Sequence, residues 1–232
     1  MSDADRDLEQ LASAPPPVPP PLSPELEAEL GKLAPVAMRR PLRQLALLVG
    51  ISLIYALGLV YALTMRKDMH ELPMGWLVGA ALGWLFGFLV PSYLALMPRR
   101  GAVTPRWKLA AVAAVVASIG FISLGMFIHP MGESSVSLGW EHFGRGHSCL
   151  EIGLATALVP VVVGAIFLRG ALPVGSRWIA AALGAGGGCL GGLVLHLHCH
   201  YADGLHVGLI HGGVVVVAAV FSAAVVPRAT ST

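Results

Sequence analysis

The chain contains 232 residues with a formal net charge of +2 at pH 7, and 56% of them are hydrophobic while only 12% are charged. Soluble domains usually carry about 25% charged residues, and the mean hydropathy here is +0.74. The composition therefore excludes an ordinary soluble domain and predicts a membrane protein.

Residues 1–44 differ from the rest and are expected to form a largely disordered cytoplasmic tail. The stretch APPPVPPPLSP favours an extended chain that cannot build a core. The first apolar run begins near Leu45, behind this tail, whereas a signal peptide would place a short apolar core at the very N-terminus. We therefore expect the first membrane helix to be an uncleaved anchor.

Within the tail, Ser23 and Pro24 predict the start of a short amphipathic helix over 24–34. A helix of this length is not stable alone in water. Docking on a partner protein is the favoured interpretation, and lying on the membrane surface is the alternative. Three glutamates on the segment disfavour an anionic membrane surface. The predicted docking stripe has i, i+4, i+7 spacing and consists of Leu26, Leu30 and Leu33.

The rest of the chain, 45–227, is predicted to be an all-α membrane domain, a bundle of six transmembrane helices. Each apolar run is close to the length of about 20 residues that spans a bilayer. The predicted spans are 45–65, 74–97, 109–129, 150–168, 178–197 and 207–226.

The placement of Lys and Arg predicts the orientation of these spans. Twelve of the fifteen basic residues lie in the tail, in two alternate loops or at the C-terminus, and the exceptions are Arg66, Lys67 and Arg145. Basic residues concentrate on the cytoplasmic side of membrane proteins. We therefore expect both termini to be cytoplasmic.

Two predicted spans carry glycines at every fourth position, which allows close approach of neighbouring backbones. The stripes are Gly75, Gly79, Gly83 and Gly87, and Gly184, Gly188 and Gly192. Packing between helices of one chain is the favoured interpretation, and a homodimer is the other.

All nine histidines fall on the predicted outer side, together with two of the three cysteines. Imidazole and thiolate ligands suit Zn, Cu and similar transition metals. On a continuing helix, His196 would share a face with Cys199 and His200. The candidate sensing residues are Cys149, Cys199, His147, His196, His198, His200 and His211, and the candidate metal ligands among them are His196, His198, Cys199, His200 and Cys149.

Several interpretations of this cluster stay open at this point. The histidines could simply lie at the membrane interface, Cys149 and Cys199 could form a disulfide in an oxidising compartment, or protonation could sense pH. No spacing matches a known metalloenzyme or zinc-finger pattern. Catalysis is not expected, because Glu151 is the only acidic residue near a span that could act as a general acid or base. The sequence does not identify a cofactor.

The C-terminal half, with Cys149, Pro160, Arg169, Pro173, a glycine-rich helix, the His198-Cys199 pair and His211, resembles the NrsF-type membrane anti-sigma factors. The segment LGKLAPVAMRRPLRQ before the first span is also similar to that family. Within that family, the chain is similar to a regulator of light-induced carotenoid synthesis.

That resemblance implies a six-helix protein of the bacterial inner membrane, which holds an extracytoplasmic-function (ECF) sigma factor at the membrane until a stress signal arrives. It implies no direct contact with nucleic acid. The paired cysteines would respond to a metal or to an oxidant, including one generated by light, and a lipid change is another candidate signal. The sigma factor would bind the tail through Leu26, Leu30, Leu33, Arg39 and Arg40. The competing hypotheses are a metal-binding membrane enzyme or metal carrier, and a plain structural membrane protein.

Overall fold

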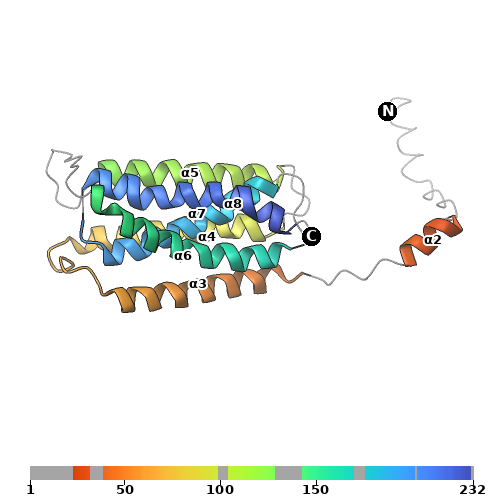
Figure 1. Ribbon diagram of the computed structural model, residues 1–232, viewed down its shortest axis with the longest axis horizontal. Coiled ribbons are helices and arrows are strands. Elements are labelled where there is room, and N and C mark those ends of the chain that lie inside the picture. The colour runs from red at the N-terminus through yellow and green to blue at the C-terminus, as the bar shows by residue number, and fades with distance from the viewer. Residues whose placement is uncertain are drawn as a thin grey trace, which may run out of the picture. The chain divides into compact units, whose positions relative to one another are not determined.

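A computed structural model describes residues 23–31, 39–98, 104–128, 143–169, 176–201 and 203–230. The regular elements of these ranges are all helical (Figure 1). The chain divides into two compact units, Met1–Arg39 and Arg40–Thr232. Within the described ranges, six helices are long and apolar enough to cross a membrane. The predicted class, an all-α polytopic bundle, is therefore confirmed.

The first unit contains the helix α2 (Pro24–Gly31). The amide of Leu26 donates to Ser23 Oγ at 3.3 Å, so Ser23 caps the helix as predicted from the sequence. The side chain of Leu26 is 47% exposed. Residues 32–38, which include Leu33, and the side chain of Leu30 lie outside the described part of the chain.

The second unit contains six long helices that run alternately in opposite directions (Figure 1). At about 1.5 Å per residue, each of the first five exceeds the hydrocarbon core of about 30 Å, and the sixth does so together with the turn before it, over His206–Thr230. An even number of spans places Arg40 and the C-terminal residues at one end of this bundle. The helices are α3 (Pro41–Leu63), α4 (Met74–Leu96), α5 (Arg106–Phe127), α6 (Gly146–Leu168), α7 (Ser176–His198) and α8 (Gly212–Thr230), the last preceded by the π-helical turn η2 (His206–His211).

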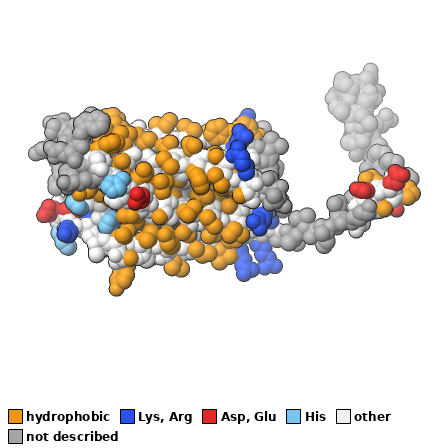
Figure 2. Space-filling view, viewed as in Figure 1, with side chains coloured by type: hydrophobic (Ala, Val, Ile, Leu, Met, Phe, Trp, Pro, Cys, Tyr) orange, Lys and Arg blue, Asp and Glu red, His pale blue; other side chains and the backbone are white. Residues whose placement is uncertain are grey.

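The outer helices present apolar side chains away from the bundle. On α3, for example, Ile54 is 73% exposed, Leu57 is 67% exposed and Tyr61 is 90% exposed. Figure 2 shows the same apolar cover over the visible side of the bundle. Such a surface is unstable in water but matches the lipid tails that surround a transmembrane bundle.

Helix α7 is the centre of the bundle and contacts each of the five other long helices. Its middle is buried on every side, from Ile179 to Gly192. A Cβ added at Gly187 would lie 2.7 Å from the carbonyl oxygen of Ala157 on α6, and one at Gly186 would lie 2.9 Å from that of Phe88 on α4. Glycine is therefore needed on several faces of α7, because neighbouring backbones touch it directly.

The glycine stripe of α4 behaves differently. A Cβ at Gly87 would collide with Phe121 and Cys189, whereas one at Gly75, Gly79 or Gly83 would meet no atom within 4 Å. Intramolecular packing therefore accounts for one of these four glycines. Gly79 and Gly83 line a cavity that is described below.

The packing of α7 generates the first prediction, which compares Gly188→Val with Gly58→Val. A side chain at Gly188 would strike the backbone of Val215, and overpacking of this kind costs about 1–3 kcal/mol or more. Gly58 on α3 faces open space, so the same change there should be neutral. Unfolding of the purified variants in detergent measures both, and equal midpoints would contradict the packing role.

Candidate functional site

The candidate site lies at the end of the bundle that is opposite to Arg40 and the C-terminal residues. The connections after α3 and α7 meet there with the first residues of α6 and with η2 (Figure 1). In Figure 2 the visible histidines gather at this end, whereas Lys and Arg side chains gather mainly at the other end of the bundle. The structure therefore separates the imidazoles from most of the positive charge along the helix axes.

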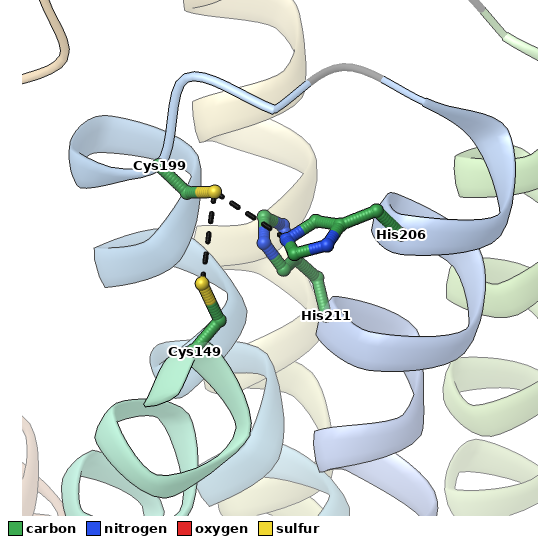
Figure 3. A group of neighbouring side chains, drawn as sticks. All are labelled: Cys149, Cys199, His206 and His211. Atoms are coloured by element: carbon green, nitrogen blue, oxygen red, sulfur yellow. Dashed lines mark hydrogen bonds between the residues drawn. The ribbon is translucent and has the colours of Figure 1, made fainter. Parts of the chain in front are cut away.

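Four side chains meet inside this end of the bundle (Figure 3), and we call them the Cys2His2 cluster: Cys149, Cys199, His206 and His211. The two Sγ atoms and one ring nitrogen from each histidine lie within 4.8 Å of one another. Cys149 Sγ and Cys199 Sγ are 3.7 Å apart, and Cys199 Sγ is 3.4 Å from His206 Nε2. All four residues are buried, and both cysteines are free thiols.

Three elements supply these side chains. Cys149 lies in the first turn of α6, Cys199 directly follows the last residue of α7, and both histidines belong to η2. The amide of Cys199 still donates to the carbonyl of Leu195 at 2.7 Å, which holds its side chain in the register of α7. The cluster thus joins the ends of three helices that are distant in sequence.

The π-helical turn η2 explains why His206 and His211 face the same way. In an α-helix, residues five apart point about 140° away from each other. In a π-helix the hydrogen bonds run between residues five apart, and here Gly212 donates to the carbonyl of Val207. The wider turn places His211 beside His206, with ring centroids 5.1 Å apart.

This wide turn packs closely on α5 because glycines form the contact. A Cβ at Gly125 would lie 2.8 Å from the Cα of Gly208, and one at Gly212 would lie 2.9 Å from the Cα of Ile122. The backbone of η2 is therefore held against α5, which fixes the position of both histidines.

Arg66, in the connection after α3, caps the end of α7. Its Nη1 donates to the carbonyl of His196 at 3.2 Å, and its amide donates to the carbonyl of Leu197 at 3.0 Å. The last carbonyls of a helix lack intrahelical donors, and a cation is favourable at this end of the helix dipole. Arg66 therefore satisfies two carbonyls that the end of the helix leaves without intrahelical donors, directly before Cys199.

Asp68 holds the Arg66 guanidinium in place through two hydrogen bonds of 2.7 Å, from Nε to Oδ1 and from Nη2 to Oδ2. Hydrogen bonding to Arg66 lowers the pKa of the Asp68 carboxyl from its ordinary value. The guanidinium also lies 5.9 Å from the ring centroid of Trp76, at cation–π distance. This network ties the first connection of the bundle to the site.

The structure places the other predicted site residues outside the Cys2His2 cluster. His196 donates from Nε2 to the carbonyl of Leu77 at 3.1 Å, and His198 donates from Nδ1 to the carbonyl of Thr64 at 2.9 Å. Helix α7 ends at His198, so His200 does not continue the helical face of His196. His200 is exposed, and its ring contacts that of Tyr201 in a tilted arrangement. His147 is exposed on α6.

His206 is the one member of the cluster that the sequence analysis did not place among the site residues. In an α-helix the i, i+5 pair His206 and His211 would not share a face, so α-helical spacing does not link the two residues. Its position five residues before a predicted ligand, inside a GLHVGLIH segment with two glycines, was the available signal.

A cavity of about 330 Å³ borders the cluster. Its wall is mostly apolar and aromatic, with Trp76, Trp84 and Phe121, and its polar part includes Arg66, Cys199 and His211. A cavity of this size admits a small molecule. The cavity therefore gives a small, largely apolar reagent a way to reach one thiol and one imidazole.

Two thiols and two imidazoles support three kinds of chemistry. They could bind a soft or borderline transition metal, the two thiols could be oxidised to a disulfide, or they could remain a hydrogen-bonded network.

The Arg66 network generates the second prediction, which compares Arg66→Gln with Lys67→Gln. Loss of the Arg66 hydrogen bonds should lower the free energy of unfolding by about 1–3 kcal/mol, whereas Lys67 is exposed and should tolerate the change. Urea or thermal unfolding in detergent measures the difference. Since the folded-state pKa of Asp68 lies below its ordinary value of 3.8, this stabilisation should be present above that pH and be lost as the pH falls further.

Comparison with known proteins identifies one family. The model of the family described as NrsF, negative regulator of sigma F, matches residues 31–231, which include every long helix of the bundle and the whole Cys2His2 cluster. No curated protein and no solved structure matches the chain. The chain thus belongs to the NrsF family, negative regulators of a sigma factor.

Proposed function

We propose that the protein is a membrane anti-sigma factor that holds an ECF-type sigma factor through its N-terminal tail. In this proposal both termini lie in the cytoplasm and the Cys2His2 cluster lies at the outer face of a bacterial inner membrane. The family match over residues 31–231 carries the proposal, because it covers the membrane bundle and the site together.

The distribution of charge supports this orientation. Basic residues stand at the end of the bundle that holds Arg40 and the C-terminal residues (Figure 2), as is usual on the cytoplasmic side. Of the basic residues at the opposite end, Arg66 is buried and occupied with capping α7. That residue therefore contributes little to the charge balance that orients a membrane protein.

The exposed face of α2 supports the tail as the sigma-binding element. An eight-residue helix that leaves Leu26 47% exposed gains stability when the leucine is covered by a partner. Leu30, Leu33, Arg39 and Arg40 complete the proposed contact surface.

We propose further that Cys149 and Cys199 sense the signal. Their Sγ atoms, 3.7 Å apart, need only a small movement to reach disulfide bonding distance, and the neighbouring cavity reaches Cys199. The stimulus in this proposal is an oxidant, including one generated by light, or a metal.

The third prediction tests the tail, with Leu26→Asp compared to Ala28→Asp in the full chain. Both side chains are exposed, and they point about 160° apart on the helix. Leu26→Asp should abolish co-purification of the sigma factor, while Ala28→Asp should leave it unchanged. Equal retention of the sigma factor by both variants would show that this face of α2 does not bind it.

The fourth prediction tests the thiols in cells that carry a reporter of the sigma factor. Cys149→Ala and Cys199→Ala should remove the difference between basal and induced expression. Cys189→Ala is the matched control, because Cys189 is fully buried beside Gly87 and away from the cluster. Normal induction in both site variants would exclude the thiols from sensing.

A further inference from the structure

We propose that Cys149, Cys199, His206 and His211 form a closed, four-coordinate site for one transition-metal ion of the Zn²⁺ class. The regulatory role of this metal ion rests on the proposed sensing function, because the ion would be the ligand of the sensing cysteines. Metal binding itself is a property of this chain alone and is testable without a sigma factor.

Two distances in the cluster match those of a tetrahedral centre. Zn–S bonds are about 2.3 Å and Zn–N bonds about 2.0–2.1 Å. In a tetrahedron with those bonds, two sulfurs lie about 3.8 Å apart, and a sulfur and a nitrogen about 3.5 Å apart. The observed separations are 3.7 Å between the two Sγ atoms and 3.4 Å from Cys199 Sγ to His206 Nε2. These two separations already equal those of a coordination shell, and all four ligand atoms lie within 4.8 Å of one another, so a small movement of the side chains would complete the shell.

His211 supplies a second and independent observation. It is 3% exposed, and its Nε2 has no hydrogen-bond partner among the described residues. Figure 3 shows its ring beside that of His206, close to the two sulfurs. An unsatisfied buried nitrogen costs about 1–3 kcal/mol. A metal ion bound by this ring would remove that cost.

The chemistry of the donors selects the ion. Hard cations such as Mg²⁺ and Ca²⁺ prefer oxygen ligands, and this cluster contains none, whereas thiolate and imidazole together suit Zn²⁺ and related ions. Two thiolates also neutralise the two positive charges of the ion. A neutral centre avoids the large cost of an isolated charge in a buried site.

Four protein ligands leave no open position for a substrate. Closed tetrahedral sites of this kind are structural, whereas catalytic zinc sites keep a position for water. The proposed ion would connect α6, the end of α7 and η2. This arrangement argues against the enzyme alternative and favours a metal that holds the outer helix ends together.

The three histidines that the sequence analysis proposed as ligands differ from those of the cluster. His196 and His198 each bond a backbone carbonyl, and His200 is exposed. They provide internal controls, because a change at one of them should leave the metal bound, whereas a change at His206 or His211 should release it.

The test uses the full-length chain, purified in detergent with a tag that lacks histidine and then supplied with Zn²⁺ or Co²⁺. Mass spectrometry of the metal should find about one ion per chain, as expected for a single four-ligand site. The Co²⁺ form should show absorption bands of tetrahedral thiolate coordination. Cys149→Ser, Cys199→Ser, His206→Ala and His211→Ala should each lose the bound metal and the bands, while His198→Ala and His147→Ala should keep both.

X-ray absorption of the Zn²⁺-loaded unmodified chain needs no variant, so it tests the metal site even if a variant fails to fold. Two sulfurs at about 2.3 Å and two nitrogens at about 2.0–2.1 Å are expected. A first shell without sulfur would identify adventitious binding by surface histidines. Full metal content in His206→Ala and His211→Ala, or no metal in the unmodified chain, would also overturn the site.

The metal-site proposal and the anti-sigma proposal can fail independently of each other. A chain that retains a sigma factor but binds no metal contradicts this inference alone. A chain that binds the metal through these four ligands but retains no sigma factor contradicts the anti-sigma proposal and leaves the metal site standing.

Discussion

The direct contact of neighbouring backbones with α7 is the constraint on which the rest of the structure depends. Lipid tails are as apolar as the helices, so a membrane bundle gains little from hydrophobic burial and must pack closely. Glycines on several faces of α7 let α4, α6 and α8 approach to backbone contact. The position of Cys199 at the end of this central helix, and its distance from Cys149 and η2, follow from that packing.

The class and number of helices could be predicted because long apolar runs have few alternatives in a bilayer. The central position of α7 in the bundle could not be predicted from the sequence. Its sequence shows a stripe at Gly184, Gly188 and Gly192, but Gly192 faces Trp84 of α4 while the other two face α8. Glycines outside the stripe, such as Gly187 and Gly191, approach α6. Periodicity on one helix cannot reveal which partners surround it.

The candidate site was partly accessible from the sequence. The sequence points to Cys149, Cys199 and His211, because thiols and imidazoles gather at the same helix ends. His206 was missed because its pairing with His211 depends on a π-helical turn, and α-helical spacing separates the two. His196 and His198 show the converse: their residue types fit a metal, but backbone carbonyls that only the fold brings near already engage their rings.

The central place of α7 also has a consequence for biosynthesis. It is the fifth of six spans to emerge, so α3 to α6 enter the bilayer before the helix that contacts them all has been made. Chains are generally assembled from the N-terminus onward, and helices insert before they pack. Until α7 arrives, the surfaces of Phe88 and Ala157 that receive its glycines face lipid or each other. The bundle, and with it the pairing of Cys149 with Cys199, is therefore completed only near the end of synthesis.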